Sequence, residues 1–422
     1  MTDYMHAPRQ PNILFIHTDQ QHFGALSALG CKEVRTPNMD RQVKRGVTFT
    51  SSYSANPLCC PARACWYTGR PASENGTLSN EHKILPDMPD LGQWFRSHGY
   101  ESFYSGKWHV LGRPHPTSFN ALTWEPSGQG EHCDPMVSRS AQAFLRNYTG
   151  DKPFFLSLGF LQPHDCCYWT FANPLDIGKL PYPSLEKELP KLPRNYDCAI
   201  EEPETIRKHI VGLRNWTHSW SDLHWRYYIW NYYRMVEMVD AELGRVLDAL
   251  EDSKFASNTL VVFTADHGDG LARRKLIQKW FLYDEAVRVP MVIVPPGGAD
   301  ARTDAGHVVS GLDIAPTLCD FAGIPPIPKA RGRSLKPLLD GSNPAWREFV
   351  VSESNINGRM VRTPEYKLIT YQGDTVDHLF DVRNDPWEMH DLATDARHSD
   401  RVPDMKKLLR DWEGGLEPAP VS

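Results

Sequence analysis

Four short apolar segments, each followed directly by polar residues, constrain the fold of this chain more than any other feature. Between them lie stretches with apolar residues at helical spacing, among them residues 91–98, 138–148 and 225–250. Alternating strands and helices predict an α/β fold with a large, mostly parallel central sheet flanked by helices. Polar residues after such strands meet at one edge of the sheet, where sites form. The segments are 12–16, 101–104, 154–159 and 259–264, and the polar residues after them include Asp19, Lys107, His164 and Asp266.

The sequence pattern changes after about residue 345, which predicts a second, smaller unit. Short strand candidates at 349–352, 367–371 and 378–380 precede a final helical stretch at 403–413. This order is typical of an α+β subdomain. We therefore expect a tail at residues 1–10, a catalytic domain at 11–344 and a C-terminal α+β subdomain at 345–422.

The charge balance argues against strongly anionic partners. The 422 residues include 46 Lys and Arg against 52 Asp and Glu, a formal net charge of −6. Neither nucleic acid nor a membrane surface is therefore an expected partner. No apolar run approaches the roughly 18 residues of a membrane span, and residues 1–10 lack the apolar core of a signal peptide. We expect a cytoplasmic protein, or an exported one if a leader has been removed.

Two polar pairs at strand ends predict a site for a hard divalent cation. Asp19-Gln20 and Asp266-His267 each place a carboxylate beside a neutral oxygen or nitrogen donor. Oxygen ligands of this kind suit hard cations, and the imidazole widens the choice of metal. Either pair alone could equally be a helix cap or a turn.

Lys107 and His109 stand two residues apart in the Gly-Lys-Trp-His segment after the strand at 101–104. Alternation along an extended strand would direct both side chains to one face and into one pocket. A Lys supplies fixed positive charge for an anion, and a His can transfer a proton near neutral pH. The alternative interpretation is a surface Lys and a core His.

Cys59 is one of nine cysteines, none of which has the C-x-x-C spacing of a zinc ribbon. Pro61 and Arg63 follow Cys59 at two and four residues, and the stretch closes in Thr-Gly-Arg at Arg70. C-x-P-x-R can occur by chance, and a Cys in a chain of this size is often a small buried hydrophobe. The pattern therefore needs support from other motifs.

Together and in this order, the motifs resemble those of the type I sulfatases, which belong to the alkaline-phosphatase-like superfamily. The resemblance covers about residues 11–395 and implies an alkaline-phosphatase-like fold for the catalytic domain. The matching positions are Asp19-Gln20, Cys59 to Arg70, Lys107 to His109, Pro163-His164, Thr264 to Gly268, and Lys279 with Arg288 to Pro290.

The resemblance implies that the reacting group of the mature protein is a modified residue and not one of the encoded amino acids. In this family a maturation enzyme oxidises the Cys at the position of Cys59 to Cα-formylglycine. The hydrate of this aldehyde is the nucleophile of sulfate ester hydrolysis. A formylglycine-generating maturation enzyme is therefore an expected partner of this chain.

Further roles follow from the same resemblance. His109 is implied as the base that restores the aldehyde, and Lys107 and Arg63 as the groups that hold the formylglycine oxygens. His164 and Lys279 are implied to contact the sulfate and the leaving oxygen. The implied catalytic set is thus Cys59, Arg63, Lys107, His109, His164 and Lys279.

The family's metal site maps onto the two polar pairs and the modified Cys. Many sulfatases carry a second Asp where this chain has Gln20, and the Asp-Gln variant is similar to choline-sulfatase-like and phosphonate-monoesterase-like members. Ca²⁺ is the expected ion, and Mn²⁺ and Mg²⁺ remain open. The implied ligands are Asp19, Gln20, Cys59, Asp266 and His267.

The expected reaction is hydrolysis of a sulfate monoester of a carbohydrate to an alcohol and inorganic sulfate. One alternative is a phosphonate monoester or phosphodiester hydrolase of the same superfamily, which the pair Lys107 and His109 disfavours. Another is an aryl or choline sulfatase. A third is a non-catalytic protein that binds a sulfated ligand and keeps Cys59 as a thiol.

Basic and aromatic residues are the candidates for contacts with the alcohol part of the substrate, because they suit anions and sugar rings. A solvated basic loop is the alternative interpretation for the charges near residue 273. The aromatic residues at 216–233 are expected to pack a helix pair, with lining of the outer pocket as the alternative. The oligomeric state is left open. The candidate substrate residues are Asn80, Arg113, His115, Arg273 and Arg274.

Overall fold

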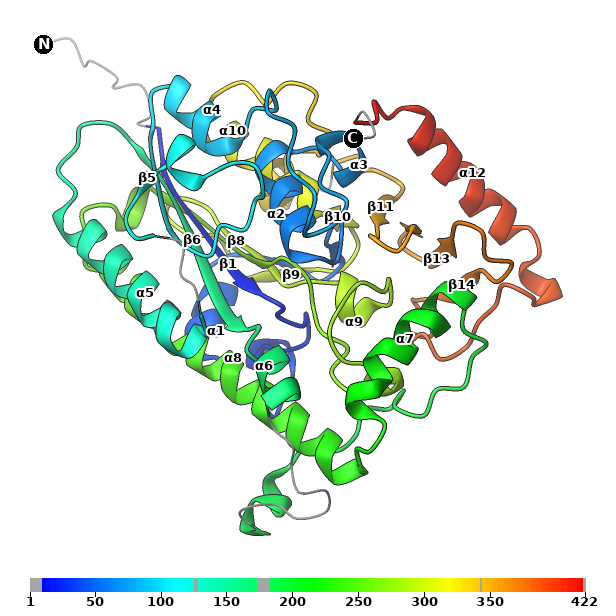
Figure 1. Ribbon diagram of the computed structural model, residues 1–422. Coiled ribbons are helices and arrows are strands. Elements are labelled where there is room, and N and C mark those ends of the chain that lie inside the picture. Colours follow the sequence, from blue (N-terminus) through cyan, green and yellow to red (C-terminus); the bar gives the residue numbers. More distant parts are fainter. Residues whose placement is uncertain (1–9, 125–127, 173–182, 342–343, 420–422) are drawn as a thin grey trace, which may run out of the picture.

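The computed structural model describes residues 10–124, 128–172, 183–341 and 344–419 (Figure 1). An eight-stranded sheet in the order β5-β4-β6-β1-β7-β8-β2-β9 forms its centre. Neighbouring strands are parallel except for β8, which is antiparallel to β7 and β2. The predicted α/β class with a mostly parallel sheet is confirmed. The strands are β1 (Asn12–Asp19), β2 (Val47–Phe49), β4 (Glu101–Gly106), β5 (Asn120–Ala121), β6 (Phe154–Pro163), β7 (Thr259–Ala265), β8 (Met291–Val294) and β9 (Arg302–Asp304).

The central strand β1 is apolar at consecutive positions because helices cover both faces of the sheet (Figure 1). Leu14 and Ile16 pack into the apolar cluster on one face, and Ile13 and Phe15 alternate into the cluster on the other. The first face carries α1 (Pro37–Val43), α5 (Gly130–Asn147) and α8 (Asp222–Glu251), and the second carries α2 (Cys59–Thr68), α4 (Leu91–Ser97) and α10 (Ile314–Ala322).

The C-terminal part forms a separate antiparallel sheet in the order β11-β12-β13-β14. Apolar residues of this sheet and of helix α12 (Arg401–Gly414) share one cluster, so the helix covers one sheet face. A small α+β unit is therefore present, as predicted. Its strands are β11 (Val350–Glu353), β12 (Gly358–Arg362), β13 (Tyr366–Tyr371) and β14 (His378–Asp381).

The remaining helices and a small second sheet lie before the C-terminal sheet in the chain. The helices are α3 (Ala72–Asn75), α6 (Cys166–Ala172), α7 (Glu204–Thr217), α9 (Asp284–Val287) and α11 (Lys336–Leu339), and a two-stranded sheet pairs β3 (Ser52–Tyr53) with β10 (Val309–Ser310).

Helix α8 contains most of the aromatic stretch at 216–233. Trp225, Tyr228 and Tyr232 are buried in the core against the sheet, and Trp220 packs edge-on against Trp225. The packing interpretation therefore holds for these rings.

Within the described ranges, no helix is long and apolar enough to cross a membrane.

The segment that carries Lys107 and His109 differs from the predicted extended strand. Strand β4 ends at Gly106, whose φ is +99°, and His109 has a φ of +48° in the left-handed region. Two such residues turn the chain, so strand alternation does not describe where the two side chains lie. The N–H of Lys107 still donates to the carbonyl of Gly159 at 2.9 Å, which holds the turn on β6.

We expect Gly106→Ala to lower the free energy of unfolding by at least about 2 kcal/mol. The new Cβ would collide with the carbonyl oxygen of Gly159 and would also occupy a positive φ. Gly99→Ala is the control, because Gly99 has a φ of +91° and open space around it. Urea denaturation of both variants separates the collision from backbone strain, and equal losses would contradict this account.

Candidate active site

The nucleophile candidate lies at the start of helix α2. Leu58 before it is extended, and Pro61 is tolerated in the first turn because the N–H groups there have no helical partner. Gly69, with a φ of +68°, ends the helix by donating to Cys65. The Asn80 side chain accepts the N–H of Cys60 at 3.0 Å, which places this predicted residue beside the nucleophile candidate.

Four donor groups converge at this helix end, as the sequence predicted for a metal site. Strands β1 and β7 are paired, so Asp19 and Asp266 follow adjacent strand ends. One ligand atom from each of the four residues lies within 4.8 Å of the others, and all four side chains are buried. The Sγ of Cys59 is 3.2 Å from Nε2 of His267. The group consists of Asp19, Cys59, Asp266 and His267.

Arg63, on helix α2, forms ion pairs with the carboxylates of both Asp19 and Asp266. Its guanidinium is fully buried and lies 3.0 Å from Asp19 and 2.9 Å from Asp266. It also donates to the backbone carbonyl of Lys107 at 2.7 Å. Since an unpaired charge in such a place is very unfavourable, this contact set holds the helix, two strand ends and the β4 turn together.

Two lysines complete an excess of positive charge around Cys59. The Nζ of Lys107 lies 2.7 Å from the Asp19 carboxylate, and the Nζ of Lys279 lies 3.1 Å from the Cys59 sulfur. With Arg63, three permanent cations face the two carboxylates of Asp19 and Asp266. Because a divalent ion would add to this excess, the arrangement suits an anionic substrate.

The charges shift the pKa values of the acidic groups in opposite directions. Burial favours the neutral form of both carboxyls, but Lys107 and the neighbouring cations hold the pKa of Asp19 well below its usual range. Burial and the charge of Asp19 raise the pKa of Asp266. For Cys59, burial and Asp19 raise the pKa, yet Lys279 and the other cations outweigh them and leave it well below that of a free thiol.

His164 follows the end of β6 and belongs to this charged cluster. Burial, and then the charge of Lys107, lower the pKa of its imidazole to about 3. The ring is therefore neutral at ordinary pH. Its Nδ1 has no hydrogen-bond partner within the described part of the chain, and Tyr168 packs edge-on against the ring at 5.8 Å. A neutral imidazole so placed can hydrogen-bond an incoming ligand.

Gln20, which the sequence predicted as a ligand, lies next to the four donor groups, because Lys279 contacts both its side-chain oxygen and the Cys59 sulfur, and its role as a ligand stays a prediction. Its φ of +67° turns the chain, and its side-chain oxygen accepts from Lys279 at 2.8 Å. Its amide nitrogen donates to Asp269 at 2.8 Å and approaches the sulfurs of Cys166 and Cys167. The amide of Gln20 is thus engaged in positioning Lys279.

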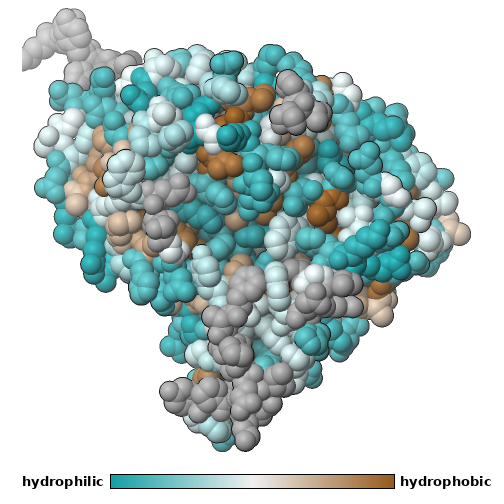
Figure 2. Space-filling model, in the orientation of Figure 1, coloured by the Kyte–Doolittle hydropathy of each residue, from teal (hydrophilic) through white to brown (hydrophobic). Residues whose placement is uncertain are grey.

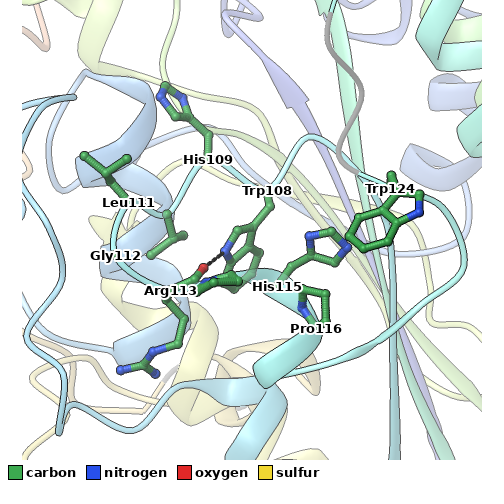
Figure 3. Close-up of a pocket in the computed structure, with 10 residues that line it drawn as sticks. Trp108, His109, Leu111, Gly112, Arg113, His115, Pro116 and Trp124 are labelled. Carbon is green, nitrogen blue, oxygen red and sulfur yellow. Dashed lines mark hydrogen bonds between the residues drawn. The ribbon is translucent and has the colours of Figure 1, made fainter.

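A cleft of about 560 Å³ opens beside the site and contains two of the predicted substrate residues on its wall (Figure 3). These two are Arg113 and His115. His109, predicted as the catalytic base, lines the cleft too, and its proton-transfer role stays a prediction. The lining residues are Trp108, His109, Val110, Leu111, Gly112, Arg113, Pro114, His115, Pro116 and Trp124.

The arginines predicted as substrate contacts are held by the protein itself. Arg113 binds Asp90 at 2.7 Å and three backbone carbonyls, and its guanidinium points away from Trp124 (Figure 3). Arg274 is buried against the ring of Tyr283 at 4.1 Å and the carbonyl of Glu388. Acceptors and ring faces of the protein thus already engage both guanidinium groups, and their predicted contacts with a substrate stay predictions.

Arg273 is only partly buried and lies against the rings of Phe23 and Trp387. The Arg273 guanidinium lies in close contact with the imidazole of His22. Its predicted contact with a substrate stays a prediction.

Sequence reasoning missed two residues that the structure places at the site. Asp269 anchors Gln20 and accepts the Tyr228 hydroxyl at 2.8 Å. Its place three residues after Asp266, in Asp-His-Gly-Asp, could have indicated it. Trp124 stands at the cleft with an exposed indole, and a lone Trp in a polar, Pro- and Gly-containing stretch was the available signal.

Comparison with known proteins gives the class of this fold and site. A family model described as Sulfatase matches residues 11–324, and one described as N-sulphoglucosamine sulphohydrolase, C-terminal, matches residues 273–414. The chain belongs to the sulfatase family, whose members are hydrolases of the alkaline-phosphatase-like superfamily.

Individual relatives cover nearly the whole chain. A Δ4,5-hexuronate-2-O-sulfatase of Bacteroides thetaiotaomicron is 30% identical, over 96% of this chain and 89% of its own. An N-acetylglucosamine-6-O-sulfatase of the same organism is 27% identical, over 96% and 86%. A solved structure described as a 2-O GAG sulfatase superposes with a TM-score of 0.86 at 28% identity, over 98% and 95%.

We expect Arg63→Met to lower the free energy of unfolding by about 3–5 kcal/mol in the presence of a chelator, because two buried carboxylates lose their shared counter-ion. Added Ca²⁺ should recover part of this loss by binding between Asp19 and Asp266. Chemical denaturation with and without Ca²⁺ measures both effects.

Arg41→Met is the matched control, since Arg41 pairs with Asp248 at the surface. It should cost about 1 kcal/mol or less, with no dependence on Ca²⁺. A similar loss in both variants, or one that ignores Ca²⁺ in Arg63→Met, would contradict the structural role of Arg63.

Proposed function

We propose that this protein hydrolyses a sulfate monoester of a carbohydrate, releasing an alcohol and inorganic sulfate. The observation that carries the proposal is the set of three cations, the buried Arg63 and Lys279 and the half-buried Lys107, around a nucleophile position at a helix start. Fixed cations at the place where negative charge develops are commonly the largest contribution to such catalysis. The two relatives named for sulfated sugars support a glycosaminoglycan-type saccharide as substrate.

The residues at the site fit both groups that the family implies. Two carboxylates and an imidazole around Cys59 form a donor set for a divalent cation, and we propose Ca²⁺, with Mn²⁺ and Mg²⁺ as alternatives. Asp19, Gln20, Asp266 and His267 would hold the ion, which would polarise the ester. Conversion of Cys59 to formylglycine by a maturation enzyme would supply a nucleophilic oxygen.

The remaining residues bind the anion and the leaving group. We assign Lys279 to a sulfate oxygen, because its Nζ lies 3.1 Å from the Cys59 sulfur and Gln20 holds it there. Lys107 adds charge on the Asp19 side. We assign His164, neutral at ordinary pH, to a hydrogen bond with the leaving oxygen.

The competing function within the superfamily is hydrolysis of a phosphonate monoester. Gln20, in place of a second acidic residue, favours it. The pair Lys107 and His109 favours the sulfatase, because the family resemblance implies that the phosphonate hydrolases do not keep this Lys-x-His pair. A phenol or choline, in place of a sugar, remains an alternative for the alcohol part of the substrate.

Paired hydrolysis rates test the proposal, with protein whose conversion at residue 59 has been verified by mass spectrometry. The substrates are an aryl sulfate, an aryl phosphonate monoester and a panel of sulfated disaccharides. We expect the sulfate esters to dominate and a disaccharide to be the best of them. Cys59→Ala should fold normally and lose all turnover, whereas a dominant phosphonate rate would refute the sulfatase proposal.

We expect Lys107→Ala and Lys279→Ala each to lower kcat/KM at least about a hundredfold, the scale of one lost preorganised charge. Lys275→Ala is the control, because Lys275 pairs with Asp197 on an exposed loop. Steady-state kinetics on the best substrate measures the change. Near-normal rates in both active-site variants would mean that the sulfate group of the substrate binds at another site.

A further inference from the structure

Trp124 is the most exposed large apolar side chain in the described part of the protein. Its indole is 80% exposed at the wall of the cleft beside the site. The face of the molecule shown in Figure 2 is mostly hydrophilic, with small separated apolar patches. Trp is enriched at binding interfaces, because its indole offers a large apolar face together with a polar N–H group.

The wall behind Trp124 is rigid. The Trp108 indole donates to the carbonyl of Arg113 at 2.6 Å and closes the turn between them (Figure 3). Arg113 binds Asp90 at 2.7 Å and anchors that turn to the preceding loop. His115 is buried, lies 5.9 Å from the Tyr104 ring and meets Trp124 edge-on at 6.3 Å. Little order has to be gained when a ligand enters such a wall.

The cleft is continuous in sequence and in contact with the nucleophile end of α2. Lys107, which contacts Asp19, directly precedes the first lining residue. The N–H of Leu111 approaches the Cys60 sulfur at 3.5 Å. The cleft thus adjoins the start of α2 through Leu111 and the Asp19 side of the site through Lys107.

The chemistry of the residues that line the cleft limits the kind of ligand that it can bind. Arg113 is the one permanently charged side chain among the lining residues, and its guanidinium is bound to Asp90 and to backbone carbonyls. The accessible surface is aromatic, aliphatic and imidazole. A volume of about 560 Å³ lies within the range of about 300–1,000 Å³ that small-molecule clefts span. Such a surface fits the apolar face of an uncharged sugar ring better than a second anionic group.

We propose that Trp124 is the platform of a sugar-binding subsite, on which a pyranose ring of the leaving saccharide stacks against the indole. This inference rests on the proposed function, and it adds a specificity residue that acts on the saccharide and not on the sulfate. Its ring contact contributes to recognition of the sugar, while the cations around Cys59 recognise the charge.

The test compares Trp124→Ala, Trp124→Phe and Trp216→Ala in matured protein, using the sulfated disaccharide that the unsubstituted protein turns over fastest. Trp216 is the control because it is a partly exposed indole on α7 outside the cleft lining. We expect Trp124→Ala to raise KM about tenfold, the scale of one lost aromatic contact, with kcat and inhibition by inorganic sulfate unchanged. Trp124→Phe should restore most of the affinity. Equal behaviour of Trp124→Ala and Trp216→Ala would overturn the proposal.

A binding measurement separates this proposal from the proposed function. The sulfate-free disaccharide is titrated into Cys59→Ala protein, with and without Trp124→Ala, and followed by ligand-observed NMR. Binding that depends on Trp124 supports the subsite even if no sulfated saccharide is hydrolysed, in which case only the proposed function fails. Absence of binding, or binding that ignores Trp124, overturns the subsite whatever the enzyme hydrolyses.

Discussion

The contact on which the rest of this site depends is that of the buried Arg63 guanidinium with two carboxylates. Asp19 ends β1, Asp266 follows β7, and Arg63 projects from α2 between them. The same guanidinium binds the carbonyl of Lys107 after β4. Because none of these charges can be left unpaired away from water, helix, sheet edge and turn must adopt one arrangement. Cys59 is carried to the donor groups by that arrangement.

The same charges then determine what the site can bind. The two carboxylates prepare a place for a cation, while the three permanent cations leave a surplus of positive charge for an anion. Gln20 contributes by holding Lys279 through a neutral amide, so it adds no further negative charge. Charge recognition is thus concentrated within a few ångströms of Cys59. The adjoining cleft, whose Arg113 is engaged internally, presents mainly aromatic, aliphatic and imidazole groups, which suits the sugar ring that we propose as its ligand.

The sheet, its strand ends and the small C-terminal unit could be predicted because local apolar patterns and turn residues specify them. The convergence of Asp19, Asp266 and His267 was also predicted, since paired parallel strands bring their ends together, and the family resemblance added Cys59 to them. The strand prediction for Lys107 to His109 was wrong because Gly106 and His109 adopt positive φ, which the pattern does not reveal. Arg113 looked like a substrate contact because its acceptors, Asp90 and several carbonyls, are distant in sequence.

The sequence by itself determined the α/β class, the family motifs and the residues able to supply a nucleophile, cations and metal donors. These properties follow from residue type, spacing and periodicity, which are local. Only the tertiary structure decided which charges are free to meet a ligand. It tied Arg63 to two carboxylates, turned Gln20 toward Lys279 and left Trp124 exposed on the wall of the adjoining cleft. The physical reason is that the partner of a buried charge is chosen by packing between distant segments, and no local pattern encodes that choice.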